Sequence, residues 1–176
     1  LDDLGLPAFF KELTEKQKAV LSDRYELDIK RSVIPIILKG LKQFPHLNDK
    51  SIYLACTLQK QKKHSSTQFA LIEVPLTFHN RFIELPDVGG KKCIVLLEDV
   101  IRANMPSLFG QLGYKIFNSY LIKITRDAEL DIDNDVDANI VNALQKSLKK
   151  RSLGNTTRFV YDKDINTQLL NYLKLK

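Results

Sequence analysis

The sequence lacks the features that would place it in a membrane or outside the cell. None of its apolar runs approaches the roughly 18 residues that a membrane-spanning helix needs, and the longest, Val33 to Leu38 and Cys93 to Leu97, have the length of core strands. The start of the chain, Leu1 to Leu4, has no basic region ahead of an apolar stretch, so no secretory signal is predicted. Both cysteines, Cys56 and Cys93, fall within apolar runs. This setting favours reduced core residues and a cytoplasmic origin over a disulfide.

The motifs of a self-contained active site are also missing. There is no phosphate-binding loop of the G-x-x-x-x-G-K-[ST] type and no G-x-G-x-x-G turn, because residues 89–92 (Gly-Gly-Lys-Lys) have the wrong spacing. No serine or cysteine lies in a nucleophile elbow. His46, His64 and His79 have no second histidine, cysteine or acid at metal-ligand spacing, and surface positions are the simpler interpretation. The sequence therefore predicts no catalytic, cofactor or metal site within these residues.

The acidic segment 131–137 resembles the start of a calcium loop. The EF-hand pattern requires glycine at its sixth position and glutamate at its twelfth, and these positions hold Val136 and Asn142. The favoured interpretation is that the acids precede a helix over residues 134–150, whose N-terminal dipole stabilises negative charge.

What the sequence does have is a mild basic excess, a formal charge of +6, which favours anionic partners. No Asp or Glu occurs from Ala138 through Thr157, and basic residues follow one another there and just beyond: Lys146, Lys149, Lys150, Arg151 and Arg158. Such a cluster suits a phosphate chain, because Lys and Arg supply both charge and donors, but it equally suits a solvated helix C-terminus. Direct nucleic-acid binding is disfavoured, because the aromatic residues fall at core-like positions.

Periodicity predicts a single α+β domain over residues 1–176, with a mixed or mostly antiparallel sheet and helices packed on one face. Strands are expected at residues 32–38, 52–58, 69–74, 82–85, 93–97, 114–125 and 158–161. Helices are expected from Thr14 toward Ile29, from residue 98 to about 106–110, at 134–150 and at 165–175. Residues 59–67 are expected to form a long, basic hairpin connection that contains Lys60, Lys62 and Lys63, and residues 86–90 a loop.

Five stretches, in order, resemble the head, or middle, domain of the large polyphosphate kinases. The most specific is Ile124 to Asp131, in which a strand ends in Thr-Arg-Asp-Ala-Glu before an acidic helix start. The others are residues 69–75, residues 81–86, residues 94–102, and residues 147–151 followed by 157–161. The resemblance spans nearly the whole chain, and only the first thirty or so residues match loosely.

The resemblance implies a part of an enzyme that reversibly transfers the terminal phosphate of ATP to inorganic polyphosphate, with magnesium and through a phosphohistidine. It also implies that the histidine nucleophile and the phosphate-binding arginines lie in C-terminal domains, and a nucleotide-pocket asparagine in an N-terminal domain. None of those motifs is present in the chain, whose two ends are interpreted as cut points. This segment is therefore expected to be inactive by itself and to bind no cofactor. Its expected partners are the other domains and further copies of the enzyme, with membrane association of the whole enzyme left open.

Two functions remain open at this stage. The first is a non-catalytic head domain that makes subunit or domain contacts and helps to shape the polyphosphate path. Here Arg126, between a strand and the acids Asp127 and Glu129, either fixes the next helix through an ion pair or faces an interface. The second is a stand-alone module that binds polyphosphate or nucleic acid. The candidate polyphosphate or subunit contacts are Arg126, Lys149, Lys150, Arg151 and Arg158.

Overall fold

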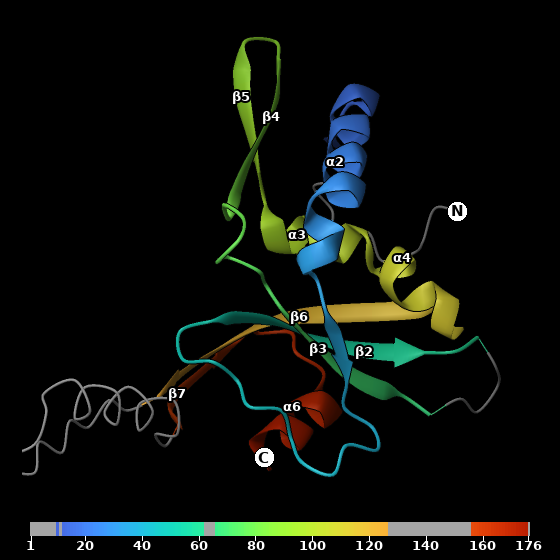
Figure 1. Cartoon of the computed structure of the whole chain (residues 1–176), viewed down its shortest axis with the longest axis vertical. Coiled ribbons are helices and arrows are strands. Elements are labelled where there is room, and N and C mark those ends of the chain that lie inside the picture. Colours follow the sequence, from blue (N-terminus) through green and yellow to red (C-terminus); the bar gives the residue numbers. More distant parts are fainter. Residues whose placement is uncertain (1–9, 11, 62–65, 127–155, 176) are drawn as a thin grey trace, which may run out of the picture.

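A five-stranded antiparallel sheet forms the centre of the molecule, and a two-stranded hairpin stands apart from it (Figure 1). The computed structural model describes residues 10, 12–61, 66–126 and 156–175. The order of strands in the sheet is β1-β3-β2-β6-β7, and the hairpin is β4-β5. The strands are β1 (Pro35–Ile37), β2 (Ile52–Gln59), β3 (Gln68–Glu73), β4 (Phe82–Val88), β5 (Lys91–Leu96), β6 (Ile116–Arg126) and β7 (Thr156–Tyr161). Every pairing among the described strands is antiparallel, whereas the sequence had left a mixed sheet open.

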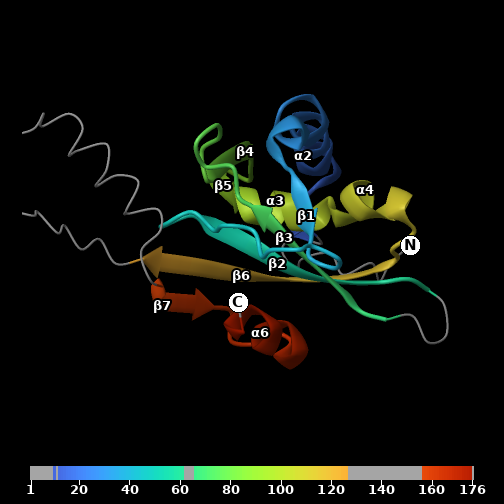
Figure 2. The ribbon, with the colours of Figure 1, turned by 60° about the horizontal axis from the view of Figure 1, so that its bottom comes forward.

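The helices lie on both faces of this sheet. They are α2 (Glu15–Leu27), α3 (Leu97–Ala103), α4 (Met105–Phe109) and α6 (Thr167–Lys174), with two 3-10 turns, η1 (Ile29–Ser32) and η2 (Gly110–Leu112). Figure 2 shows α2, α3 and α4 on one side of the sheet and α6 on the other. The α+β class is confirmed, and α6 adds cover to the second face. The helix predicted at residues 134–150 lies outside the described residues.

Two cores follow from the two-residue alternation of the strands. Leu54, Cys56 and Leu58 of β2 point into the core beneath α2 and α3, while Tyr53 and Ala55 point into the core beneath α6. The same alternation on β6 buries Ile122 and Ile124 in the second core.

Helix α2 begins with a capping box, at the residue where the sequence predicted the start of a helix. The Thr14 hydroxyl oxygen accepts a hydrogen bond from the Gln17 backbone, and the Gln17 side-chain oxygen accepts one from the Thr14 backbone. The Gln17 amide nitrogen also donates to the Pro86 carbonyl over 2.9 Å. This buried glutamine therefore caps its own helix and joins it to strand β4.

The hairpin β4-β5 corrects the loop prediction for residues 86–90. Strand β4 continues to Val88, which pairs with Lys91, and the turn itself consists of Gly89 and Gly90. Both glycines have positive φ angles, 58° and 75°, which a two-residue hairpin turn requires. A register shift between Leu85 and Val88 accommodates Pro86, because a proline cannot donate a ladder hydrogen bond.

The helix predicted from residue 98 to about 106–110 is divided in two. Helix α3 ends before Asn104, whose side-chain amide donates to the Val100 carbonyl over 2.8 Å. Pro106 then lies in the first turn of α4, where its missing N–H costs no helical hydrogen bond. The sequence interpretation was wrong here because this proline starts a helix rather than stopping one.

Two further expectations can be compared with the structure. Cys56 is buried in β2 and Cys93 is half-buried in β5, and both are free thiols, as predicted. No helix in the described part of the chain is long and apolar enough to span a bilayer.

Candidate functional site

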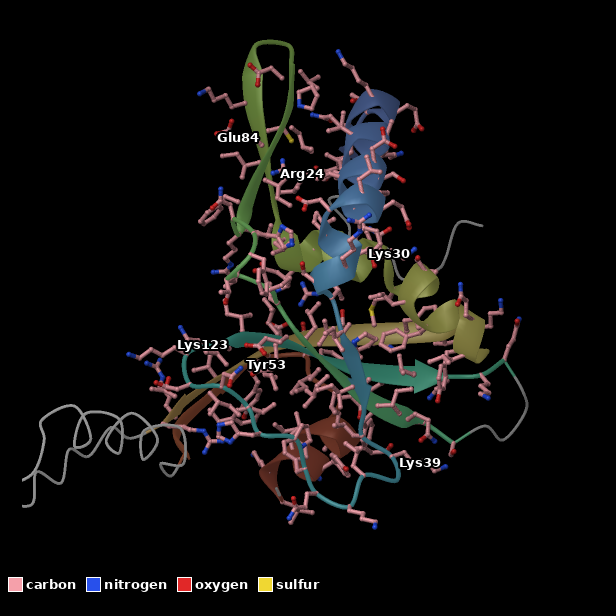
Figure 3. All side chains as sticks on the ribbon, in the orientation of Figure 1. Arg24, Lys30, Lys39, Tyr53, Glu84 and Lys123 are labelled. Atoms are coloured by element: carbon pink, nitrogen blue, oxygen red, sulfur yellow. The ribbon has the colours of Figure 1, made fainter. Side chains whose placement is uncertain are left out.

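Basic side chains gather at the end of the sheet where β6 pairs with β7. In this register Thr125 lies opposite Arg158, and Lys123 lies opposite Val160. Lys123 and Arg158 are therefore diagonal neighbours on one face of the sheet, within reach of a common ligand. Figure 3 shows Lys123 at this end of the sheet. We call Lys123, Arg126 and Arg158 the basic sheet end.

Strand alternation places the two cations in solvent. Because Ile122 and Ile124 point into the core beneath α6, Lys123 must point to the opposite face. That face is open here, since Val160 is 44% exposed. Lys123 and Arg158 are both exposed, and neither has an ion-pair partner among the residues that the structure describes. Both charges are thus available to an anion.

Arg126 has a positioning role at the same end. Its backbone N–H donates to the Asp49 carboxylate over 2.8 Å, and its Nε donates to the Leu47 carbonyl over 3.3 Å. These contacts tie the end of β6 to the loop before β2. The proposed ion pairs with Asp127 and Glu129 lie outside the described residues, as do the candidates Lys149, Lys150 and Arg151.

The basic hairpin between β2 and β3 is described only in part. Lys60 lies over the Tyr114 ring, with its Nζ 5.5 Å from the ring centroid. Lys62, Lys63 and His64 lie outside the described residues.

Sequence reasoning missed Lys123, although a signal was present. Lys123 stands between Ile122 and Ile124 in a predicted strand, so alternation places it on the face opposite these two apolar residues. What the sequence could not provide is the register that brings it beside Arg158.

A buried ion pair joins the hairpin to α3. The Arg81 Nε and Nη2 atoms donate to the Glu98 Oε1 over 2.9 and 2.5 Å. The Glu98 side chain is fully buried, whereas that of Arg81 is 37% exposed. The hydrogen bond to Glu98 raises the pKa of Arg81, so the guanidinium stays charged. The pair therefore fixes the start of the hairpin against α3.

A second charged cluster ties α3 to the strands of the sheet. The Arg102 Nη1 donates to Asp99 over 3.0 Å, and its Nη2 donates to Asp162 over 3.1 Å. The Asp162 carboxylate also accepts the Leu121 backbone N–H over 2.7 Å. Burial raises the pKa of Asp99, and the Arg102 charge opposes that rise. These acids are engaged in the fold, and no group of three or more potential metal ligands occurs among the described residues.

His79 is not the surface residue that the sequence suggested. Its side chain is only 11% exposed, and its Nδ1 lies 3.6 Å from the Asp28 carboxylate. Its Nε2 lies 3.0 Å from the Ser32 hydroxyl. His46 is exposed, as expected. The partners of His79 are 47 and 51 residues away along the chain, so its burial and its contacts could not be predicted from a local sequence pattern.

Comparison with known proteins places this architecture in a family. The family model described as the polyphosphate kinase middle domain matches residues 16–176. The chain belongs to the polyphosphate kinase family. It is 30% identical over 166 residues to a polyphosphate kinase of Vibrio parahaemolyticus, covering 92% of this chain and 23% of that protein. It is 32% identical over 171 residues to a polyphosphate kinase of Halalkalibacterium halodurans, covering 94% of this chain and 24% of that protein.

A solved structure agrees with the sequence relatives. The polyphosphate kinase from Porphyromonas gingivalis superposes with a TM-score of 0.70 at 26% identity, covering 91% of this chain and 22% of that one. The chain thus spans about a quarter of the length of the curated polyphosphate kinases it matches. The resemblance inferred from the five segments is confirmed. Two of those segments, residues 81–86 and 94–102, supply the Arg81–Glu98 ion pair.

Proposed function

We propose that this chain is the non-catalytic middle domain of a cytoplasmic polyphosphate kinase, which catalyses ATP + polyphosphate(n) = ADP + polyphosphate(n+1). In this proposal the domain contacts other domains or subunits of the enzyme, and its basic sheet end lies along the polyphosphate path. ATP and Mg²⁺ are bound by the whole enzyme rather than by this part. The observation that carries the proposal is the side-by-side exposure of Lys123 and Arg158 without protein partners among the described residues.

The pairing of charged groups supports a non-catalytic role. The buried or half-buried carboxylates Glu98, Asp99 and Asp162 are held by arginines, so they are not available as general bases. The chain also covers only about a quarter of its curated relatives, which leaves most of the enzyme to other segments.

The outer face of the β4-β5 hairpin supports a contact with the rest of the enzyme. Phe82 and Ile94 on the outer face are 63% and 53% exposed, while Ile83 and Val95 on the inner face are buried. A two-stranded hairpin is only marginally stable alone, and here one face packs on α2 while the other carries apolar side chains in water. Another domain of the same enzyme is the occupant that we propose for this outer face.

Binding of polyphosphate by matched variants tests the proposal. The double variant Lys123→Ala, Arg158→Ala should weaken binding at low salt by about tenfold or more, because each charge-assisted contact contributes about 1 kcal/mol or more. The control Lys91→Ala, Lys92→Ala removes the same charge from the exposed tip of the hairpin and should change affinity little. The triple variant at Lys149, Lys150 and Arg151 tests the remaining candidates in the same way.

Two results would count against the proposal. If the double variant and its control lose the same affinity for polyphosphate, binding depends on net charge and not on the basic sheet end. Formation of ADP by the chain alone, with ATP, Mg²⁺ and polyphosphate, would show that the domain is catalytic.

A further inference from the structure

The turn before β2 is held against the end of β6 by three hydrogen bonds. The Lys50 backbone N–H donates to the Ile124 carbonyl over 3.0 Å. Just before it in the chain, the Asp49 carboxylate and the Leu47 carbonyl accept hydrogen bonds from Arg126 over 2.8 and 3.3 Å. The fold therefore fixes the Lys50 backbone beside the basic sheet end.

Lys50 has a backbone conformation that a side chain disfavours. Its φ angle is 61°, and no other non-glycine residue in the described part of the chain has a positive φ. Glycine adopts this left-handed region without the steric cost that a Cβ atom brings. The Lys50 side chain is exposed and has no ion pair or hydrogen bond with a described residue that would offset this cost. Backbone strain of this kind is often found at binding sites.

Lys50 completes a row of exposed cations across the end of the sheet. It adjoins β6 from the side of β2. On the other side of β6, Arg158 of β7 lies opposite Thr125. Lys123, on β6 itself, lies between these two cations. Because neighbouring strands are about 4.8 Å apart, the backbones of Lys50 and Arg158 are about 10 Å apart.

The described acids that lie in or against this turn are engaged by the fold. Asp49 accepts the Arg126 backbone N–H, and both oxygens of Glu73 accept the Asn48 side-chain amide over 3.1 Å. None of the ion pairs among the described residues involves a member of the row. The three cations therefore repel one another, and a polyanion bound across them would relieve that repulsion.

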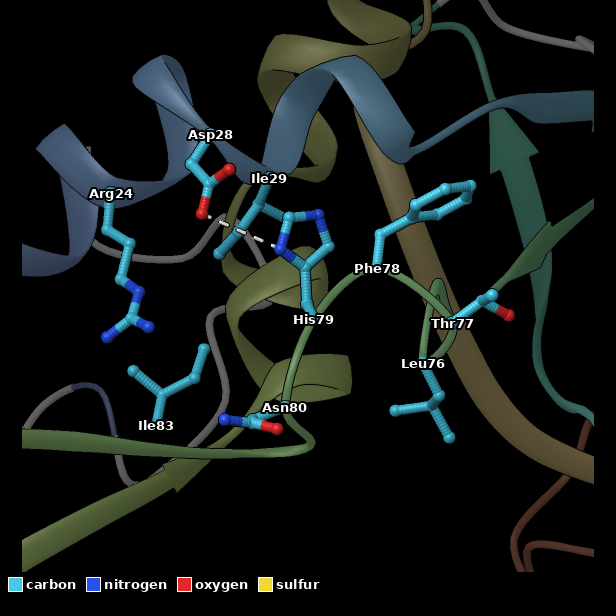
Figure 4. A pocket seen from close by; sticks show the side chains of 9 residues that line it. All are labelled: Arg24, Asp28, Ile29, Leu76, Thr77, Phe78, His79, Asn80 and Ile83. Carbon is cyan, nitrogen blue, oxygen red and sulfur yellow. Dashed lines mark ion pairs between the residues drawn. The ribbon is translucent and has the colours of Figure 1, made fainter.

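A single exposed cation does not make such a site, as Arg24 on α2 illustrates. Arg24 is also exposed, at a cavity of about 250 Å³. Figure 4 shows that the Thr77 side chain points away from it and that the Asp28 carboxylate is directed at the His79 ring. Arg24 is the only lysine or arginine among the described residues that line this cavity, so it serves as a control.

We propose that Lys50 is a third phosphate contact beside Lys123 and Arg158, and that the polyphosphate chain crosses the end of the sheet from the side of β2 to the side of β7. The inference rests on the proposed function and deepens it, because it gives the chain a direction and a minimum length. To reach both Lys50 and Arg158 the ligand must span about 10 Å, so several linked phosphates fit and a single phosphate does not.

Titrations of the 176-residue chain with polyphosphate test the role of Lys50. Lys50→Ala should weaken binding at low salt about fivefold or more, because one charge-assisted contact is lost. The slope of the logarithm of the binding constant against the logarithm of salt concentration should become shallower by about 0.7. Lys50→Arg keeps the charge and should keep most of the affinity, and the control Arg24→Ala should bind as the wild type does.

A second substitution separates binding from folding. Lys50→Gly removes the charge and also the backbone strain, because glycine tolerates a φ angle of 61°. Its affinity for polyphosphate should fall as far as that of Lys50→Ala, while the midpoint of thermal unfolding should not fall. A lysine with a merely structural role would lower both quantities on removal.

The outcomes distinguish this inference from the proposed function. If Lys50→Ala binds as tightly as the wild type while Lys123→Ala, Arg158→Ala loses affinity, the third contact is overturned and the proposed function stands. Equal losses in Lys50→Ala and Arg24→Ala also overturn it, as does inorganic phosphate that displaces polyphosphate equally well at the same total phosphate concentration. If the wild-type chain does not bind polyphosphate at all, the inference and the proposed function fail together.

Discussion

At the level of single residues, the charged side chains divide into those that hold the fold and those that face solvent. Glu98 and Arg102 belong to the first group, because their partners come from distant parts of the chain. Lys123 and Arg158 belong to the second. The difference has a direct energetic consequence, since a buried charge that loses its partner is costly while an exposed one is rehydrated.

Removal of Arg81 tests the buried pair. Arg81→Ala leaves the fully buried Glu98 carboxylate without its partner, so we expect a loss of about 2–3 kcal/mol in the free energy of unfolding at neutral pH. This expected loss is at or below the usual range for breaking a buried ion pair, because Arg81 itself is partly exposed and its charge is screened by solvent. Arg31→Ala, which removes an exposed arginine, should cost less than about 0.5 kcal/mol. Urea denaturation measures both, and similar small losses in the two variants would contradict a structural role for the pair.

The two cysteines should differ in reactivity. Burial raises the pKa of the Cys56 thiol from its usual 9.0 to about 12, with the Arg102 charge opposing the rise. The folded protein therefore keeps this thiol protonated at pH 8, and only the thiolate attacks an alkylating reagent. Half-buried Cys93 should react with iodoacetamide first, as mass spectrometry of the intact chain can show. The variant Cys93→Ser should gain no adduct until it unfolds, and rapid labelling of that variant while folded would refute the burial of Cys56.

The raised pKa also predicts a pH dependence of stability. Because the folded value lies above the unfolded one, the contribution of Cys56 is fully present below pH 9 and is lost as the pH rises toward 12. Cys56→Ala should therefore make the alkaline fall in unfolding free energy shallower than in the wild type.

At the level of elements, the β4-β5 hairpin presents two faces of opposite character. Ile83 packs inward under α2, whereas Ile94, on the partner strand, is 53% exposed. We expect Ile83→Ala to cost about 3 kcal/mol, because it leaves a cavity in the core. Ile94→Ala should cost less than about 1 kcal/mol, since it loses only strand propensity. Thermal unfolding of the two variants measures the contrast, and a large loss for Ile94→Ala would mean that the outer face serves the domain's own fold.

Elements with local signals could be predicted from the sequence. The capping box at Thr14 and Gln17 fixed the start of α2, and alternation located β2, β3 and β6 to within a few residues. Pro35 lies in β1, an edge strand that pairs only with β3 among the described strands, which is where a proline is tolerated in a sheet. These elements could be predicted because the interactions that determine them lie within one helical turn or one strand.

Features that depend on distant contacts could not be predicted. The Arg81–Glu98 pair joins residues 17 apart, and the Arg102–Asp162 contact joins residues 60 apart. A proline fits both the first turn of a helix and the residues beyond its end, so the sequence placed the end of a single helix near Pro106 and missed the break at Asn104. For the candidate site, the run of basic residues pointed to Arg158 and the family resemblance to Arg126, whereas the neighbour Lys123 required the β6-β7 register.

At the level of the whole molecule, the domain has one surface for each partner that we propose. The hairpin with α2 projects from the sheet, as Figure 1 shows, and exposes its apolar outer face. The basic sheet end lies on a different element pair, β6 and β7. A middle domain with separate surfaces of this kind can contact another domain and a phosphate chain at the same time.

The salt dependence of polyphosphate binding tests the central proposal most directly. Counterion release makes the logarithm of the binding constant fall linearly with the logarithm of salt concentration, by about 0.7 for each phosphate contact on a single strand of nucleic acid. With Lys123 and Arg158 both engaged, calorimetric or fluorescence titrations of the wild-type chain at several salt concentrations should give a slope of about −1.4 or steeper. Absence of binding at low salt, or an affinity that does not change with salt, would contradict a place for this domain on the polyphosphate path.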